Sequence, residues 1–192
     1  MAIRTYLYLG GDSYPLDQHI EEALRNRLAE PGTLFLGERE IVGPIIHQGF
    51  ARRAHLEDAI ASLGRSGIVL IGRSSGARIV TMLAAERPGD SAVGAVVAIG
   101  YPFRHPERAD EPERYAHLPT LVTPTLIVQG ERDPYGGLDC AARFRRPPIV
   151  NVVMVDGDHE LRLLEQQWDQ VTALIRGDAA GEEGPAFSRL IS

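Results

Sequence analysis

The segment Gly72-Arg73-Ser74-Ser75-Gly76 places a serine between two glycines with the spacing G-x-S-x-G. An apolar run comes before this segment, and a helix-like pattern follows it. Between a strand and a helix, the spacing is typical of a sharp turn that exposes a nucleophilic serine, because the glycines remove β-carbons where the backbone is crowded. We therefore expect acyl chemistry at Ser74, with the Ser75 N–H as one donor to the developing oxyanion.

Two other interpretations compete with this one. A pentapeptide of this composition often occurs by chance, so alone it is weak evidence of a catalytic site. Residues 67–74 also spell G-x-x-x-x-G-R-S, one residue away from a phosphate-binding loop. That loop needs a lysine where Arg73 stands, and central residues that wrap a phosphate, whereas residues 68–71 are typical of a buried strand. The phosphate loop is therefore disfavoured.

A serine nucleophile needs a base and a group that orients the base. Asp133 comes shortly after the apolar run 125–128, and His159 shortly after the run 149–155. The carboxyl ends of parallel strands meet at the same edge of a sheet, where such sheets bind ligands. We therefore predict Ser74, Asp133 and His159 as nucleophile, orienting acid and general base.

Other residues compete for the last two roles. Asp133 before Pro134 also suits an ordinary turn, and His159 could cap the last helix. The alternative acids are Asp139, Asp156 and Asp158, of which Asp158 also suits a helix cap. The other histidines are not placed as His159 is, just after a strand: His19, His47, His55, His105 and His117. Of these, His105 and His117 could touch a substrate.

The second oxyanion donor is expected in the loop after the first apolar run, with Gly11 favoured and Asp12 as the rival. Candidate substrate-binding residues are Arg73, which stands beside the nucleophile, and four residues that follow strand ends at the same edge: Tyr101, Phe103, His105 and Tyr135. Equally, the aromatic residues could pack a loop onto the domain. Arg73 could attract an anionic substrate or form a structural ion pair.

Short apolar runs alternate with helix-like patterns along the chain. The runs cover residues 3–9, 33–36, 67–71, 92–99, 125–128 and 149–155. The first helical pattern is an i, i+4 repeat of leucine and isoleucine from Leu16 to Leu28, with Asp12 and Ser13 as caps and Pro15 in the first turn. Further apolar stripes at helical spacing cover residues 56–63, ended by Gly64, and residues 77–84 and 161–175. This alternation predicts an α/β fold, a three-layer αβα sandwich around a mostly parallel sheet of about six strands.

Residues 101–124 interrupt the alternation with prolines, charges and aromatic residues, and we expect a surface excursion with a short helix near 111–117. Residues 1–176 are predicted as a single domain, and residues 177–192 as a flexible tail rich in Gly, Ala and Glu.

Composition and net charge argue against several classes of protein. The 192 residues include one cysteine, so no internal disulfide can form. A net charge of −6 argues against binding to nucleic acid or to an anionic membrane. The sequence shows no signal-peptide layout and no apolar run of membrane-spanning length, so a cytoplasmic protein that acts on a small molecule is expected. The oligomeric state stays open.

Taken together, these residues resemble the α/β-hydrolase superfamily, in which the nucleophile, acid and histidine follow in this order. More narrowly, residues 100–103 and 124–130 are similar to stretches of small dienelactone-hydrolase-like enzymes with a minimal cap. The resemblance covers residues 3–176 and implies a serine nucleophile, no metal and no organic cofactor. Many relatives carry His-Gly where Leu9-Gly10 stands, and the first strands of larger members are not expected here. Cys140 is not at the elbow and is not expected to be the nucleophile.

The resemblance and the ordered triad predict a serine hydrolase that cleaves a small ester through an acyl-enzyme. Two alternatives stay open. The same site could perform acyl transfer or lyase chemistry, or the fold could serve as a non-catalytic binding or scaffold protein.

Overall fold

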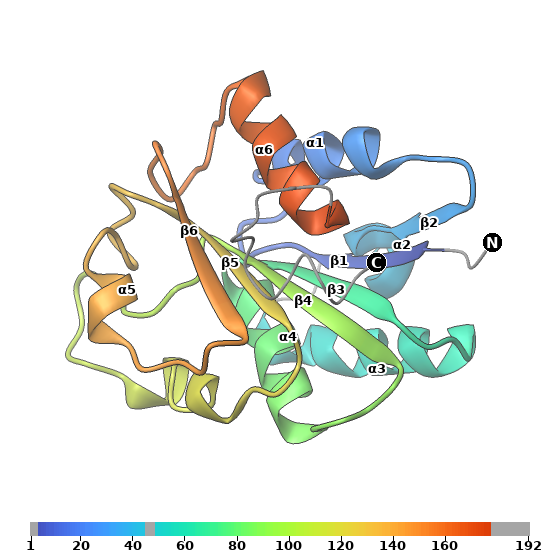
Figure 1. Cartoon of the computed structure of the whole chain (residues 1–192), viewed down its shortest axis with the longest axis horizontal. Helices are drawn as coiled ribbons and strands as arrows, with labels where there is room; N and C mark the ends of the chain where they lie inside the picture. The colour runs from blue at the N-terminus through green and yellow to red at the C-terminus, as the bar shows by residue number, and fades with distance from the viewer. Residues whose placement is uncertain (1–3, 45–48, 178–192) are drawn as a thin grey trace.

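A computed structural model describes residues 4–44 and 49–177 of the chain (Figure 1). Apart from Gly177, the predicted tail lies outside the described residues. Within the described part, six strands form one sheet in which every neighbouring pair is parallel. In sheet order they are β2 (Thr33–Leu36), β1 (Arg4–Leu9), β3 (Ile68–Arg73), β4 (Val93–Ile99), β5 (Thr125–Gly130) and β6 (Val150–Val155). The predicted parallel sheet of about six strands is confirmed.

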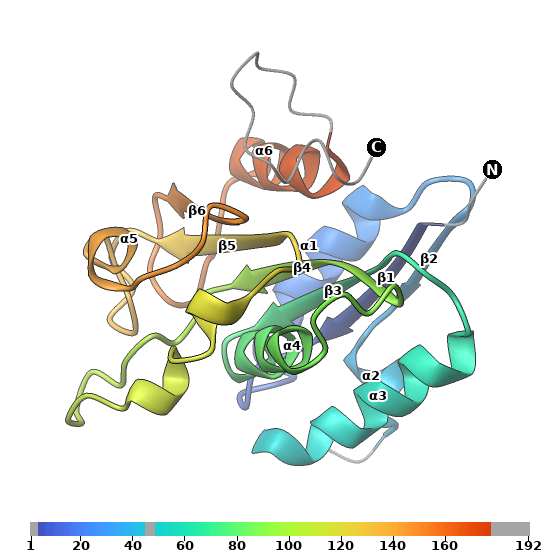
Figure 2. The ribbon, with the colours of Figure 1, turned by 60° about the horizontal axis from the view of Figure 1, so that its bottom comes forward.

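Helices cover both faces of the sheet, as Figure 2 shows. On one face α1 (Gln18–Leu28) packs beside α6 (Glu165–Arg176). On the other lie α2 (Glu38–Val42), α3 (Arg52–Leu63) and α4 (Ser75–Glu86). Because helices cover both faces, the strands are mostly apolar runs rather than alternating patterns.

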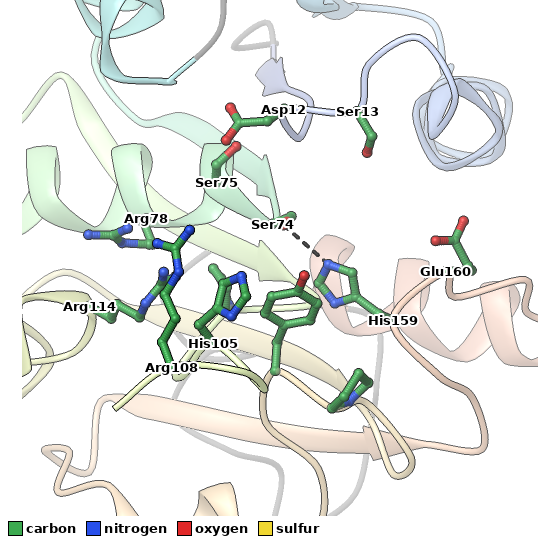
Figure 3. A pocket seen from close by; sticks show the side chains of 13 residues that line it. Asp12, Ser13, Ser74, Ser75, Arg78, His105, Arg108, Arg114, His159 and Glu160 are labelled. Atoms are coloured by element: carbon green, nitrogen blue, oxygen red, sulfur yellow. Dashed lines mark hydrogen bonds between the residues drawn. The ribbon is translucent and has the colours of Figure 1, made fainter. Parts of the chain in front are cut away.

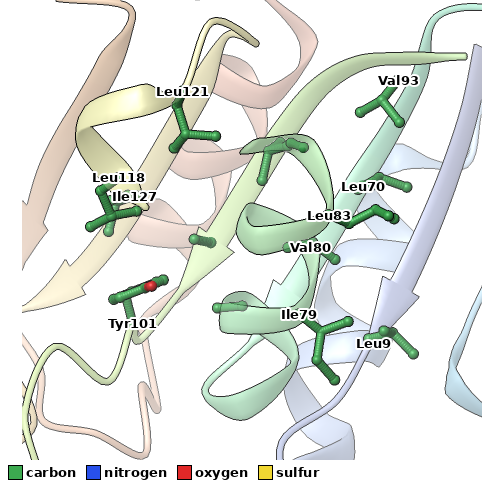
Figure 4. Packing of buried hydrophobic residues seen from close by; sticks show 14 of the residues in the cluster. Leu9, Leu70, Ile79, Val80, Leu83, Val93, Tyr101, Leu118, Leu121 and Ile127 are labelled. Atoms are coloured by element: carbon green, nitrogen blue, oxygen red, sulfur yellow. The ribbon is translucent and has the colours of Figure 1, made fainter. Parts of the chain in front are cut away.

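The core has two layers, one on each side of the sheet. Along β1, Tyr6 and Tyr8 join the cluster under α1 and α6, while Leu7 and Leu9 join the cluster under α4. This is the two-residue period of a strand. Figure 4 shows the second layer, in which Val80 and Leu83 of α4 meet strand side chains such as Leu70 and Val93. Strands β1 and β3 thus contribute side chains to both layers.

The strand order reverses between β1 and β3. From β1 the chain continues to β2 on one side, and from β3 it continues to β4 on the other. Leu9 of β1 lies in register with Gly72 of β3, so the two strands end together. Loops leaving such a pair in opposite directions open a crevice at the carboxyl edge, where open α/β sheets bind ligands.

Two predicted helix starts are wrong. Helix α1 begins at Gln18, after the turns that hold Pro15 and an 80% exposed Leu16. Helix α6 begins at Glu165, so Asp158 is not its cap, and Leu161 lies in a loop with φ +48°. Gly64 ends α3 in the left-handed region, as expected.

The excursion 101–124 carries two short 3₁₀ helices, Pro112–Arg114 and Leu118–Thr120, at the place where one short helix was expected. A further 3₁₀ turn, Gly49–Ala51, precedes α3, and α5 (Cys140–Arg143) precedes β6. In residues 4–44 and 49–177, no helix is long and apolar enough to cross a bilayer.

Candidate active site

Ser74 forms the turn between β3 and α4. Its backbone has φ +49° and ψ −115°, a conformation that costs a non-glycine residue free energy and persists only where the surroundings enforce it. A β-carbon at Gly72 would lie 2.5 Å from the Gly76 backbone, and one at Gly76 would lie 2.4 Å from the Gly10 carbonyl oxygen. The two glycines therefore let strand, helix and the neighbouring loop approach closely enough to form this turn.

The structure brings Ser74, His159 and Asp133 into one chain of contacts. Ser74 Oγ lies 3.2 Å from His159 Nε2 (Figure 3), and His159 Nδ1 lies 2.8 Å from Asp133 Oδ2. The Asp133 side chain is buried and also accepts hydrogen bonds from Gln129 Nε2 and from the Tyr135 N–H, each at 2.8 Å. These donors fix the carboxylate facing the imidazole.

The alternative acids point elsewhere. Asp139 pairs with Arg104 at 2.6 Å, Asp156 pairs with Arg132, and Asp158 accepts the Glu160 N–H at 2.9 Å. Of the four candidate acids, all of them in the described part of the chain, only Asp133 has a carboxylate within hydrogen-bond distance of the His159 imidazole. Its catalytic role, like that of Ser74 and His159, stays a prediction.

Arg73 contacts the same imidazole, and its surroundings agree with the structural role that was one of its two expected roles. Its guanidinium donates to the His159 carbonyl oxygen, and Nη1 lies 3.3 Å from Nε2. Because a guanidinium only donates, this contact requires the Nε2 lone pair, and the ring proton then lies on Nδ1 toward Asp133. Arg73 is buried, lies near Asp17 and does not line the cavity, which does not support its predicted place among the substrate-binding residues.

Of the two predicted oxyanion donors, the Ser75 N–H stays untested and the Gly11 N–H is already bonded. The Ser75 N–H lies in the first turn of α4, where N–H groups lack intrahelical acceptors. The Gly11 N–H, by contrast, donates to Asp17 Oδ2 at 3.0 Å, so it is not free to bind an oxyanion. Among the described residues, the Asp12 N–H has no hydrogen-bond partner, which makes Asp12 the better candidate. Gly11 lies beside Ser74, since a β-carbon there would be 3.3 Å from Ser74 Cβ.

Arg52 holds residues 10–12 against α4, a role that no sequence pattern predicted. It is fully buried at the start of α3, and Glu38 beside it accepts the Gly10 N–H at 2.8 Å. Burial raises the pKa of Glu38, an effect opposed by the Arg52 charge. Arg52 donates to the carbonyl oxygens of Gly10 at 2.6 Å and Gly11 at 3.2 Å, to Asp12 Oδ1 at 3.1 Å and to Ser75 Oγ at 2.8 Å. An arginine at the start of a helix gives no sequence signal for this role.

A cavity of about 660 Å³ opens above Ser74 and His159 (Figure 3). Of the predicted substrate-binding residues, His105 and Tyr135 line it, and the Tyr135 ring lies 4.4 Å from the His159 ring. Tyr101 and Phe103 do not, because they are buried and Phe103 stacks on Phe144. Other lining residues are Asp12, Ser13, Ser75, Arg78, Pro102, Arg108, Arg114, Pro134 and Glu160. The three arginines among them were not predicted.

The other histidines that the structure describes, and Cys140, lie outside the contact chain of Ser74. His117 packs against Thr81 and Tyr101, and burial lowers its pKa to about 4. His19 contacts the Glu160 carbonyl, His55 lies in α3, and His47 lies outside the described residues. Burial raises the pKa of the Cys140 thiol to about 11, which leaves it a poor nucleophile. Within the described ranges, no three His, Cys, Asp or Glu side chains gather to hold a metal.

Comparisons with known proteins agree with this architecture. The family model described as "Alpha/beta hydrolase domain" matches residues 51–180. An esterase domain from Rhodothermus marinus superimposes with a TM-score of 0.67 at 19% identity, covering 100% of this chain and 89% of that one. An alpha-beta serine hydrolase homologue from Coxiella burnetii gives 0.64 at 18% identity over 92% and 85% of the two chains. Est1E from Butyrivibrio proteoclasticus gives 0.64 at 12% identity over 91% and 87%. No curated protein sequence matches the chain.

Proposed function

Because the chain belongs to the alpha/beta hydrolase family, we propose that it is a serine hydrolase that cleaves a small ester or related acyl compound. The observation that carries this proposal is the contact chain from Ser74 Oγ through His159 to buried Asp133, with distances of 3.2 and 2.8 Å. The similarity to a domain described as an esterase favours esters as the substrate class. The narrower dienelactone-hydrolase-like assignment stays a prediction.

In the proposed mechanism, Ser74 Oγ attacks the ester carbonyl carbon while His159 Nε2 takes the hydroxyl proton. Asp133 stabilises the imidazolium that forms. The tetrahedral oxyanion accepts hydrogen bonds from the Ser75 N–H and, in this proposal, the Asp12 N–H. His159 then protonates the departing alcohol, which leaves an acyl-enzyme. Water repeats the sequence on the acyl group and releases the carboxylic acid with free Ser74.

The test is turnover of 4-nitrophenyl acetate and butyrate by the intact chain. Ser74→Ala should lower kcat at least about a thousandfold, since nucleophile and base act as a unit. Ser66→Ala, which changes an exposed serine far from the cavity, should leave kcat unchanged. If Ser74→Ala retained full turnover of every ester that the parent cleaves, the proposed nucleophile would be wrong.

Acyl transfer or lyase chemistry at the same site makes a different set of products. A competing alcohol or amine in the assay would capture the acyl group if transfer dominates. A hydrolase should instead release the free acid in proportion to the alcohol, even with the acceptor present.

One observation favours a second candidate, a non-catalytic binding protein. The Gly11 N–H, in the loop expected to supply an oxyanion donor, is occupied by Asp17. If neither ester turnover nor reaction with serine-directed reagents occurred on folded protein, this second candidate would replace the first.

A further inference from the structure

Arg78 lies one helical turn after Ser74 and lines the same cavity. Its backbone N–H donates to the Ser74 carbonyl oxygen at 3.3 Å, so the first turn of α4 fixes its position relative to the nucleophile. Four residues advance a helix by about 6 Å and place the two side chains on one face. The Arg78 guanidinium therefore faces substrate space next to the proposed reacting atoms.

The Arg78 guanidinium has no hydrogen-bond acceptor and no carboxylate partner among the described residues. Its Nε is buried without a partner. Its close contact is with the Phe50 ring, whose centroid lies 5.3 Å from Cζ. A ring binds the flat face of a guanidinium and leaves the N–H groups at its edge free for a planar oxyanion.

The other two arginines beside the nucleophile differ from Arg78. Arg52 donates to backbone carbonyls, Asp12 and Ser75, and Arg73 donates to His159. Burial lowers the pKa of the Arg78 guanidinium, and the nearby Arg114 charge lowers it further. A partly buried guanidinium without a partner is destabilised by the loss of water, and a bound anion would stabilise it.

The cavity carries an excess of positive charge around Arg78. Figure 3 shows Arg78, Arg108 and Arg114 on one side, with Asp12 and Glu160 on other walls. Glu111 pairs with both Arg114 and Arg108, the latter at 3.6 Å, so one carboxylate faces two guanidinium groups. Converging arginines attract an anionic ligand and raise its rate of association.

We propose that Arg78 binds an oxyanion group of the substrate, a carboxylate or a phosphate, located about one helical turn from the scissile bond. This inference rests on the proposed hydrolase function and names its substrate class as small anionic esters. Arg78 makes the direct contact with the anion, while Arg108 and Arg114 add attraction over longer range. The neutral aromatic and proline side chains of the cavity contact the spacer between the two groups.

Binding tests the site without any turnover. Adipate, a dicarboxylate with no scissile bond, and inorganic phosphate serve as probes in calorimetric titrations of the intact chain. Arg78→Gln should weaken binding of at least one probe roughly ten- to hundredfold, as expected for loss of hydrogen bonds to a charged group. Arg78→Lys should fall between, because it keeps the charge and loses the planar fork.

Arg87→Gln is the matched control, since it removes the same charge at the far end of α4, where Arg87 lies 3.4 Å from Glu57. It should leave the affinity for both probes unchanged. The probe whose affinity depends on Arg78 identifies the anion as carboxylate or phosphate. Equal affinity in the parent and Arg78→Gln, or no binding of either probe to the parent, would overturn the proposal.

Kinetics separate this inference from the hydrolase proposal. The mono-4-nitrophenyl ester of adipic acid is compared with 4-nitrophenyl hexanoate, which has the same acyl length without the charge. Arg78→Gln should lower kcat/KM about ten- to hundredfold for the anionic ester and leave the neutral ester nearly unchanged. Equal losses on both esters would contradict anion recognition.

If the parent turned over neither ester, the hydrolase function would be contradicted, while the titrations would still decide whether Arg78 binds an anion. If the titrations show that phosphate binds through Arg78 and adipate does not, the kinetic test uses a 4-nitrophenyl ester with a terminal phosphate in place of the carboxylate.

Discussion

Arg52 Nη2 donates a hydrogen bond of 2.8 Å to Ser75 Oγ and thereby joins the start of α3 to the residue after the proposed nucleophile. The same guanidinium holds the carbonyl oxygens of Gly10 and Gly11. One buried side chain thus sets the distance between the two backbone segments from which an oxyanion hole would be built. Arg52 is a positioning residue, because it contacts these segments and not the reacting atoms.

Arg52→Leu should damage both stability and turnover. It leaves Glu38 buried without its cation, and breaking a buried pair of this kind typically costs about 3–5 kcal/mol of unfolding free energy. Arg52→Lys keeps the charge with fewer hydrogen bonds and should retain the fold while kcat falls and KM changes little. Urea unfolding and ester kinetics measure the two effects, with Arg53→Gln, which changes the more exposed neighbour, as the control. Unchanged kcat in folded Arg52→Lys would contradict the positioning role.

Asp133→Asn should lower kcat by about 10⁴ with little loss of fold, by analogy with serine hydrolases in which the amide stabilises the wrong imidazole tautomer. Here the amide would also face the Gln129 Nε2 donor, which lies 2.8 Å from Asp133 Oδ2. Asp156→Asn is the matched control, because Asp156 is exposed and pairs with Arg132 away from His159. Comparable losses in the two variants would argue against the orienting role of Asp133.

Gly76→Ala should destabilise the protein even though alanine is the better helix former. Helix propensity favours alanine by about 1 kcal/mol. At this position, however, the new β-carbon would lie 2.4 Å from the Gly10 carbonyl oxygen and 2.5 Å from that of Leu9. Overlap with backbone atoms outweighs the propensity, so we expect a net loss of roughly 1–3 kcal/mol in urea unfolding. A variant more stable than the parent would show that the loop is not held at this distance.

The stability of the chain should decrease as the pH falls from 6.5 to 4, in part because of His117. Burial lowers its pKa in the folded chain from 6.5 to about 4, and the nearby positive charge of Arg78 adds to the effect, while Glu86 opposes it. The unfolded chain therefore takes up a proton in this window before the folded chain does, and stability is lost as the pH drops. With screening by solvent, the effect is on the order of 1 kcal/mol. His117→Gln should flatten this part of the curve of unfolding free energy against pH, and an equally steep curve in the variant would contradict the assignment.

The sequence predicted the parallel sheet, and it placed Ser74, Asp133 and His159 at one edge of that sheet, where the structure brings them into contact. Both results depend on local patterns, while the catalytic roles stay predictions. Apolar runs bounded by turn residues locate buried strands, and residues after parallel strands share one edge. Other features depend on contacts between distant segments. The start of α6 was placed too early because Leu161, although apolar and buried, packs from a loop. Arg73 lies within the elbow pattern and Arg78 lies two residues after it. Only the folded chain shows that Arg73 contacts His159 and that Arg78 lines the cavity.

The hydrogen bond of the Gly11 N–H is another feature that the local sequence pattern did not indicate. Gly11 was favoured by its place in the loop, and that place is correct, since it lies against Ser74. The Asp17 carboxylate that accepts its N–H is six residues away, in a turn that was expected to be helix. Local pattern thus located the loop, while the hydrogen bonds within it depend on the start of α1.

The most direct test of the central claim is the intact mass of the full chain after treatment with a fluorophosphonate, followed by peptide mapping. We expect a single adduct on Ser74, formed quickly at neutral pH, absent in Ser74→Ala and strongly slowed in His159→Gln. Ser75→Ala should still be labelled, because Ser75 contributes its N–H and not its hydroxyl. A folded parent chain that forms no adduct, or an adduct that persists in Ser74→Ala, would contradict an activated serine at this turn.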